Sequence, residues 1–260
     1  MSIHPSAIIG KEVELASDVS VGPFTVITGR ARIDSGTKIE SHCQIGNPNG
    51  ILEIGKNNHL LAGAMVGGQP QDISYKGEPT KLIIGDNNII REFTTLNCGT
   101  TKDGGVTQIG NNCMLMAYVH IAHDCKLGHH VIVANSTQFA GHVHVDDYAR
   151  IGGMVGIAQF ARIGRYAYIG GGATINKDIL PYSIAEGNWA KVRATNKVGI
   201  SRAGFSKSEV DGIYRAIRFL IMGGRTIAEA LQKIDEECEM TPHLQHLIDF
   251  VKSSENGIAR

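Results

Sequence analysis

The 260-residue sequence has no excess of charge, because 25 acidic residues balance 25 lysines and arginines. This balance argues against nucleic acid as the main partner. No apolar run is long enough to cross a bilayer, so we expect no membrane span. The first residues also lack a charged stretch followed by a long apolar one, and we therefore expect no signal peptide.

Paired cysteines and cofactor fingerprints are missing as well. The five cysteines form no CxxC pair, so a zinc or disulfide role is not favoured. We expect them to fill a core in a reducing cytoplasm. There is no P-loop, no Rossmann glycine pattern and no serine in a nucleophile-elbow context. The sequence therefore predicts neither a resident metal nor a cofactor.

A six-residue period of large apolar residues dominates the chain from Ile9 to Ile175. A helix repeats at 3.6 residues and a strand at 2, so neither element explains it. Short strands joined by corners do, and the period predicts a parallel β-helix of hexapeptide repeats. The longest uninterrupted run is Ile109, Leu115, Ile121, Leu127, Val133, Phe139, Val145, Ile151, Ile157, Ile163, Ile169 and Ile175.

A second column of small or β-branched residues lies two positions before the first. Residues two apart on a strand face the same side, so both columns are predicted to point into the core. Cys43, Cys113 and Cys125 belong to this second column. The remaining positions are rich in Gly, Asn, Asp and His, which suit tight corners.

Two insertions, predicted as loops at 67–83 and 97–108, interrupt the period. Loops ejected from a rigid solenoid are common sites of substrate contact, although an insertion can also be merely tolerated. The Gln, Asp, Tyr and Lys residues of the first loop favour the functional interpretation.

The period stops near Pro181 and becomes helical. Capping boxes begin at Ser206 and Thr226, and Pro242 opens a third helix expected to end near Gly257. We therefore predict a β-helix over residues 1–185 and a C-terminal α-helical domain over residues 186–260.

Residues 186–225 carry eight basic side chains against three acidic ones. This local excess suggests an acidic partner or a phosphorylated ligand, although a solvated helix face is an equal alternative. The basic residues are Lys191, Arg193, Lys197, Arg202, Lys207, Arg215, Arg218 and Arg225.

The segment around His123 is the best candidate for chemistry. If three hexapeptides form one coil, residues 18 apart stack about 4.8 Å apart. This brings Gly141 beside His123 and His142 beside Asp124, in one patch on the outer surface. A histidine next to a carboxylate can act as a general base, and a glycine N–H can stabilise an oxyanion.

A zinc site is the competing interpretation of this histidine cluster. The gamma-class carbonic anhydrases, which are also hexapeptide proteins, use a ligand pair spaced H-x4-H. This chain has His120-x-x-His123 instead. The combination of His120 or His123 with His142 keeps zinc possible but less favoured.

Longer motifs make the chain resemble the UDP-N-acetylglucosamine 3-O-acyltransferases. The similarity covers residues 3–260, including both loops and the helical end. It implies a left-handed β-helix and a homotrimer with sites between subunits. It also implies transfer of a 3-hydroxyacyl chain from acyl carrier protein to UDP-N-acetylglucosamine, the first step of lipid A synthesis. The matching segments are GQPQDISYKGEPT, HIAHDC, FAGHV, IGGM and the terminal FSKSEV and GIAR.

The resemblance also assigns residue roles. His123 matches the general base, Asp124 the carboxylate that orients it, and the Gly141 N–H the oxyanion donor. The basic segment 186–225 matches a dock for the acidic acyl carrier protein. The matched substrate-binding residues are Gln71 and Asp72 near the sugar, His120 and His142 in the pocket, Gln159 at the acyl and sugar end, Gly171 at the acyl groove, and Asn196 and Arg202 near the nucleotide.

Three positions depart from the family pattern: Ser74 replaces a lysine, Ala158 a histidine and Val198 a glutamate. Lys76 could reach back to replace the lost lysine. Each loss can cost about 1–3 kcal/mol of binding. Because His123, Asp124 and Gly141 remain, we expect the chemistry to be retained.

The departures leave alternatives open. A related acyltransferase could acylate a 3-amino UDP-sugar or use a different acyl chain. The lipid A N-acyltransferase normally has an extra N-terminal domain, for which repeats that begin by Ile9 leave no room. A non-catalytic paralogue that binds acyl carrier protein or a UDP-sugar is the remaining alternative.

Overall fold

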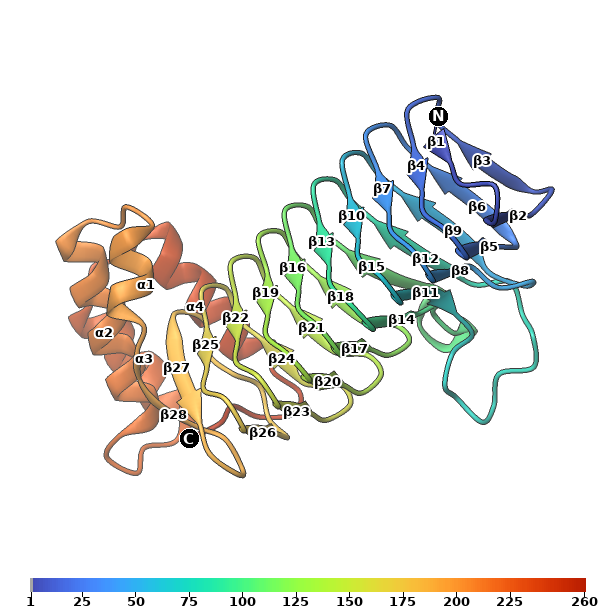
Figure 1. The fold of residues 1–260 in the computed structure, drawn as a ribbon. Helices are drawn as coiled ribbons and strands as arrows, with labels where there is room; N and C mark the ends of the chain where they lie inside the picture. The colour runs from blue at the N-terminus through green and yellow to red at the C-terminus, as the bar shows by residue number, and fades with distance from the viewer. Residues whose placement is uncertain (1) are drawn as a thin grey trace.

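The computed structural model describes residues 2–260, and most of them wind into a left-handed parallel β-helix. Figure 1 shows the coils stacked along one axis, with the N-terminus at one end and the helical segment at the other. The predicted fold class is therefore confirmed. Each complete coil contributes one short strand to each of three sheets, which we name A, B and C.

Sheet A holds β1 (Ser2–Ile3), β4 (Ser20–Val21), β7 (Lys38–Ile39), β10 (His59–Leu60), β13 (Ile89–Ile90), β16 (Met114–Leu115), β19 (Ile132–Val133), β22 (Arg150–Ile151), β25 (Tyr168–Ile169), β27 (Ser183–Glu186) and β28 (Lys191–Thr195). Sheet B holds β2 (Ile8–Ile9), β5 (Val26–Ile27), β8 (Gln44–Ile45), β11 (Met65–Gly68), β14 (Thr95–Asn97), β17 (His120–Ile121), β20 (Gln138–Phe139), β23 (Gly156–Ile157) and β26 (Thr174–Ile175). Sheet C holds β3 (Val13–Leu15), β6 (Arg30–Ile33), β9 (Ile51–Ile54), β12 (Lys81–Ile84), β15 (Val106–Ile109), β18 (Lys126–Leu127), β21 (His144–Val145) and β24 (Arg162–Ile163).

The strand register explains the sequence period. His120 pairs with Gln138, and Gln138 pairs with Gly156, so equivalent residues of successive regular coils are 18 apart. The second residue of each of these strands points inward, and Ile121, Phe139 and Ile157 are buried. Burying such a side chain contributes about 1.5–3 kcal/mol, so the column stabilises every coil.

The corners hold aromatic residues in addition to the predicted Gly, Asn, Asp and His. Many residues with a left-handed backbone are aromatic, including Tyr148, Tyr166 and Phe160. Tyr148 and Tyr166 stack with ring centroids 4.7 Å apart. A left-handed backbone costs about 1–2 kcal/mol in a non-glycine residue. Stacking between rings on neighbouring coils returns about 0.5–1.5 kcal/mol per pair, so coil spacing offsets the local strain.

Both ejected loops begin and end in strand residues, so the irregular segments are shorter than expected. The first spans residues 69–80 between β11 and β12. The second spans residues 98–105 and contains the short 3-10 helix η1 (Thr101–Asp103). Both leave the stack on the same side, as Figure 1 shows beside β11 and β14.

The C-terminal helices cap the last coils. They are α1 (Lys197–Arg202), α2 (Lys207–Ile221), α3 (Ile227–Glu237) and α4 (Pro242–Lys252). Capping boxes at Ser206 and Thr226 open α2 and α3 as predicted. Two expectations need correction: α4 ends at Lys252 rather than near Gly257, and the hairpin partner β28 continues sheet A beyond residue 185. Within residues 2–260, no helix is long and apolar enough to cross a membrane.

Candidate active site

His123 and Asp124 occupy the turn that joins sheet B to sheet C, which we call the B–C edge. The His123 Nδ1 lies 2.8 Å from the Asp124 Oδ2. Because a carboxylate only accepts, Nδ1 must carry the proton in the neutral ring. The other ring nitrogen, Nε2, then has a free lone pair and no hydrogen-bond partner among residues 2–260. This is the arrangement of an oriented general base.

The Asp124 carboxylate is completely buried, contrary to the expectation of a patch on the open surface. The second loop covers it. The Thr100 N–H donates to Oδ1 at 2.7 Å, and the Thr100 hydroxyl donates to Oδ2 at 2.6 Å. The Asp124 N–H donates to the Thr107 hydroxyl at 2.8 Å. The buried charge is thus compensated by hydrogen bonds.

Gly141 lies directly against the His123 ring, one coil further on. A Cβ built on Gly141 would approach the His123 Cε1 to 2.5 Å and Nε2 to 2.8 Å. Real side chains do not tolerate such distances, so only glycine leaves the ring in place. The stacking predicted from the 18-residue spacing is therefore present at this position.

His142 bridges two carboxylates at the same edge. Its Nδ1 lies 3.5 Å from the Asp103 Oδ2, and its Nε2 lies 3.6 Å from the Asp124 Oδ2. The ring also stacks on Phe160 at 4.7 Å and meets the His123 ring edge-on at 5.2 Å. These contacts hold the His142 imidazole beside the pair of His123 and Asp124, which we call the dyad.

His120 precedes His123 on the chain, whereas Gln159 lies two coils further along the same edge. His120 is on β17, and its Nδ1 lies 2.7 Å from the Thr95 hydroxyl oxygen. Burial, together with nearby His123, lowers the pKa of His120, so it is neutral at neutral pH. Gln159 is exposed and takes the same turn position as His123 and Gly141, 36 and 18 residues earlier.

The first loop reaches the site through an ion pair that the sequence did not reveal. The Lys102 Nζ lies 2.7 Å from the Asp72 Oδ2, and the Ser74 N–H and hydroxyl both donate to Asp72 Oδ1 at 2.7 Å. The Lys102 and Ser74 hydrogen bonds hold the pKa of Asp72 well below its usual range. Lys102, not Lys76, therefore supplies the cation beside Asp72. Gln71 precedes it and is exposed.

The nucleotide-binding candidates lie over a different face. Asn196 caps α1, accepting from the Gly199 N–H at 3.0 Å, while its amide donates to the Tyr166 carbonyl at 2.9 Å. Asn196 and Arg202 line a cavity of about 770 Å³ over sheet A, which His123, Asp124 and Gly141 do not line. The cavity is also lined by His130, Tyr148, Arg150, Tyr166, Tyr168 and Val198.

Gly171 lies at neither of these places. It is exposed in the turn between sheets A and B, and a Cβ there would meet only the Gly153 backbone, at 3.4 Å. The site candidates therefore lie in separate places, with His123, Asp124 and Gly141 on the B–C edge, Asn196 and Arg202 over sheet A, and Gly171 apart from both.

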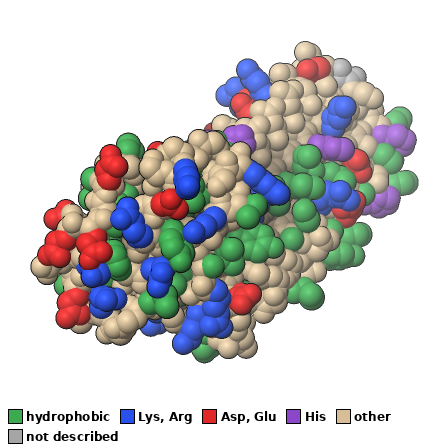
Figure 2. Space-filling model, turned by 90° about the vertical axis from the view of Figure 1, so that its left-hand side faces the viewer, with side chains coloured by type: hydrophobic (Ala, Val, Ile, Leu, Met, Phe, Trp, Pro, Cys, Tyr) green, Lys and Arg blue, Asp and Glu red, His purple; other side chains and the backbone are tan. Residues whose placement is uncertain are grey.

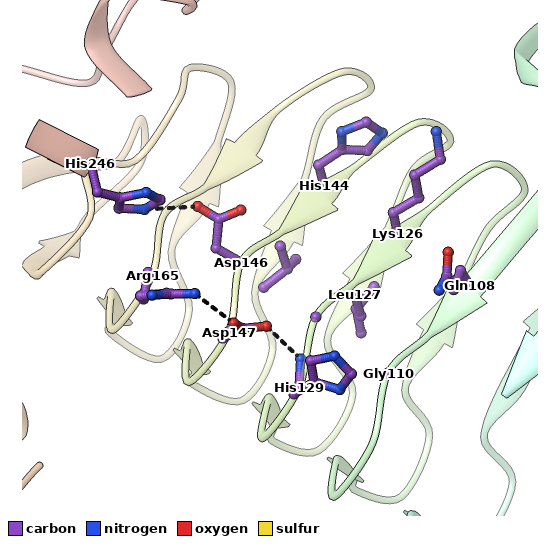
Figure 3. Close-up of a pocket in the computed structure, with 12 residues that line it drawn as sticks. Gln108, Gly110, Lys126, Leu127, His129, His144, Asp146, Asp147, Arg165 and His246 are labelled. Atoms are coloured by element: carbon purple, nitrogen blue, oxygen red, sulfur yellow. Dashed lines mark hydrogen bonds and ion pairs between the residues drawn. The ribbon is translucent and has the colours of Figure 1, made fainter. Parts of the chain in front are cut away.

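A smaller cavity of about 320 Å³ lies over sheet C (Figure 3). Its charged groups are paired: the Arg165 Nη2 lies 2.7 Å from the Asp147 Oδ2, and the His246 Nε2 lies 3.6 Å from the Asp146 Oδ2. His246 comes from α4, so its contact with Asp146 ties the helical end to the coils. The lining does not include the dyad, and its charged character does not suit an acyl chain.

His123, Asp124 and His142 also place three potential metal ligands within 4.8 Å of one another. However, the proton donors on Thr100 and on the His123 Nδ1 already converge on the Asp124 Oδ2. A metal ion would have to displace both. The geometry therefore favours acid–base chemistry over the zinc alternative.

The cysteines are all free and buried among residues 2–260. Burial raises the pKa of Cys98 and Cys113 to about 11, and that of Cys125 to about 12. The thiolate is the reactive form, so these thiols act as core filler at neutral pH.

Sequence reasoning missed Thr100, Lys102 and Asp103, which all come from the second loop. They contact Asp124, Asp72 and His142, respectively, across separations of 24, 30 and 39 residues, none of which is a multiple of the 18-residue coil. The repeat register therefore carried no signal that could find them.

The chain matches known proteins in both family models and full-length sequence. A family model described as UDP-N-acetylglucosamine O-acyltransferase, domain 2, matches residues 178–259, and a bacterial transferase hexapeptide model matches residues 107–141. The chain is 44% identical to the acyl-[acyl-carrier-protein]–UDP-N-acetylglucosamine O-acyltransferase of Saccharophagus degradans over 99% of both chains.

Solved structures agree with the sequence relatives. LpxA from Acinetobacter baumannii superposes with a TM-score of 0.94 at 41% identity, over 99% of both chains. The UDP-N-acetylglucosamine acyltransferase of Francisella novicida gives a TM-score of 0.95 at 38% identity, over 99% of this chain and 94% of that one.

Proposed function

This chain belongs to the UDP-N-acetylglucosamine O-acyltransferase family, and we propose that His123 and Asp124 form the catalytic dyad of its reaction. The enzyme transfers an acyl chain from acyl carrier protein to UDP-N-acetylglucosamine, the first step of lipid A biosynthesis. The observation that carries the proposal is the 2.8 Å contact between the His123 Nδ1 and the buried Asp124 carboxylate. It leaves Nε2 ready to accept a proton.

In the proposed mechanism, the His123 Nε2 removes the proton from the 3-hydroxyl of the sugar. The hydroxyl oxygen attacks the carbonyl carbon of the 3-hydroxyacyl thioester, and a tetrahedral oxyanion forms. When it collapses, the carbon–sulfur bond breaks and His123 returns the proton to the leaving sulfur. Asp124 stabilises the imidazolium between these two steps.

The backbone N–H of Gly141 is the proposed donor to the oxyanion. It makes no hydrogen bond within residues 2–260. The same turn position is a proline at Pro23 and Pro181, which shows that the coil itself does not need this N–H. A free backbone donor beside the base suits oxyanion stabilisation.

We propose that the active form is a homotrimer with each site between two chains. The dyad is on the B–C edge, whereas Asn196 and Arg202 are over sheet A, so one chain does not bring the two groups into one cavity. Exposed apolar residues on sheets A and B and on the turns joining them support a covered surface. They include Met65, Ile89, Phe93, Tyr118 and Met154.

A mixed assembly tests this arrangement. His123→Ala and Arg202→Ala chains, co-expressed with different tags, are each expected to be nearly inactive at low UDP-N-acetylglucosamine. Mixed trimers purified through both tags should recover about a third of the wild-type rate, because each mixed trimer combines two intact halves at one of its three sites. Hetero-oligomers as inactive as the parents would place the whole site within one chain.

The basic segment 186–225 is the proposed dock for acyl carrier protein. Figure 2 shows lysines and arginines gathered among apolar side chains at the helical end. Lys197 and Arg218 both lie over the Tyr214 ring, with Nζ and Cζ at 3.6 and 5.7 Å from its centroid. Clustered cations of this kind steer an acidic partner.

Arg218→Glu is expected to raise the KM for acyl carrier protein substrate by about five- to tenfold at low salt. The difference should shrink in 0.5 M NaCl, because salt screens exposed charges. Lys252→Glu reverses an exposed charge on α4 and serves as the control. Equal effects of the two substitutions would argue for a net-charge effect and against this dock.

The substrate roles of Gln71, Asp72, His120, His142, Gln159, Gly171, Asn196 and Arg202 remain part of the proposal. The relatives are named as O-acyltransferases, so the 3-amino sugar alternative is not favoured. The cytoplasm is the proposed location, and the five free cysteines support a reducing compartment.

A further inference from the structure

The second loop packs directly on the Asp124 carboxylate and hydrogen-bonds to it. Thr100 is buried and donates to both oxygens of the Asp124 carboxylate, through its N–H at 2.7 Å and its hydroxyl at 2.6 Å. The hydroxyl shares Oδ2 with the His123 Nδ1–H at 2.8 Å. One residue therefore sets both the position and the rotation of the carboxylate.

The backbone around Thr100 is adapted to this contact. A Cβ on Gly99 would approach the Asp124 Oδ1 to 2.8 Å and the Val106 N to 2.4 Å, so any side chain there would push Thr100 away. Backbone hydrogen bonds hold the loop at both ends: the Gly99 N–H donates to the Lys81 carbonyl and the Gly105 N–H to the Thr100 carbonyl. The threonine thus belongs to a rigid support for the carboxylate.

We propose that Thr100 is a positioning residue of the acyl transfer, which acts by holding Asp124 in the orientation that aligns His123. This inference rests on the proposed role of His123. The Thr100 hydroxyl also withdraws negative charge from Oδ2. Without it, Oδ2 attracts the protonated imidazole more strongly and the base becomes easier to protonate.

Thr100→Val removes the hydroxyl but retains the N–H and the shape of the side chain. We expect kcat/KM to fall about 10- to 100-fold, with the KM for UDP-N-acetylglucosamine unchanged. The acidic limb of the kcat/KM against pH profile should move to higher pH. Thr100→Ser keeps the hydroxyl and should restore the wild-type profile, with activity within about threefold.

The structural control is Thr37→Val. Thr37 is also fully buried, and its hydroxyl donates to the Gly55 carbonyl at 2.9 Å, far along the chain from the dyad. This variant should have lower thermal stability but an unchanged pH profile. If Thr100→Val lowers stability without moving the acidic limb, Thr100 only supports the loop and the proposal is wrong.

A double-mutant comparison keeps the proposal testable if Thr100→Val folds poorly. In an Asp124→Asn background, Thr100→Ser and Thr100→Ala should differ little in kcat, because the group through which Thr100 acts is gone. In the wild-type background they should differ at least tenfold. Equal ratios in both backgrounds overturn the inference, whereas an active His123→Ala protein would instead overturn the proposed function.

Discussion

Replacing His123 by alanine is expected to lower kcat for acyl transfer by about 10²–10⁴-fold. The substitution removes Nε2, the one ring nitrogen of the dyad that is free to accept the sugar proton. Substrate affinity should change little, because the groups proposed to bind the nucleotide are over sheet A. Single-turnover transfer from 3-hydroxyacyl carrier protein, with calorimetry of UDP-N-acetylglucosamine binding, measures both quantities.

His59→Ala is a suitable control, since His59 is half-buried, pairs with Glu40 at 2.9 Å and belongs to an earlier coil. It should retain wild-type activity. Running the assay with the 3-amino analogue of the sugar separates the remaining alternatives. Undiminished transfer by the His123→Ala protein would exclude its role as base. Transfer to the amine alone would change the acceptor, and no transfer by wild type would point to a binding protein.

Gly141→Ala is expected to cost about 10²–10³-fold in kcat/KM without unfolding the protein. The added Cβ would lie 2.5 Å from the His123 Cε1, so the ring must move out of line with the substrate. The backbone at Gly141 is not left-handed, so alanine causes no strain of its own there. Activity and thermal unfolding of the same preparation separate these two effects.

Gly212→Ala provides the matched control. A Cβ on Gly212 meets nothing within 4 Å, and the position is inside α2. Alanine there should leave activity unchanged and stabilise the helix by about 0.5–1 kcal/mol. If Gly141→Ala were equally active, the close packing of Gly141 on His123 would have no catalytic importance.

Residues inside the six-residue repeat could be placed from the sequence, whereas residues of the inserted loop could not. Ile121 and Phe139 were predicted to be core residues, and both are buried, because a six-residue period admits only one packing. Gly141 was placed beside His123 from the same 18-residue spacing. Thr100 and Lys102 were not found, since the ejected loop breaks the register and its contacts depend on how the loop folds back.

The corners show the same limit. Gly, Asn, Asp and His are predicted there and do adopt left-handed backbones, but so do Tyr148, Tyr166 and Phe160. Propensity describes a single turn, whereas the stacking that offsets the strain arises only when coils lie one above another. The extra length of sheet A at β28 likewise depends on pairing with β27, which has no sequence period.

By itself, the sequence determined the β-helix, the helical end and the neighbourhood of His123, Asp124 and Gly141. Each follows from a period or a cap that acts over short, regular spacings. Only the tertiary structure decided that Asp124 is buried, that Thr100 holds it and that Lys102 pairs with Asp72. The contacts of Thr100 and Lys102 span 24 and 30 residues rather than one 18-residue coil, and their geometry is set by loops packed against a rigid stack.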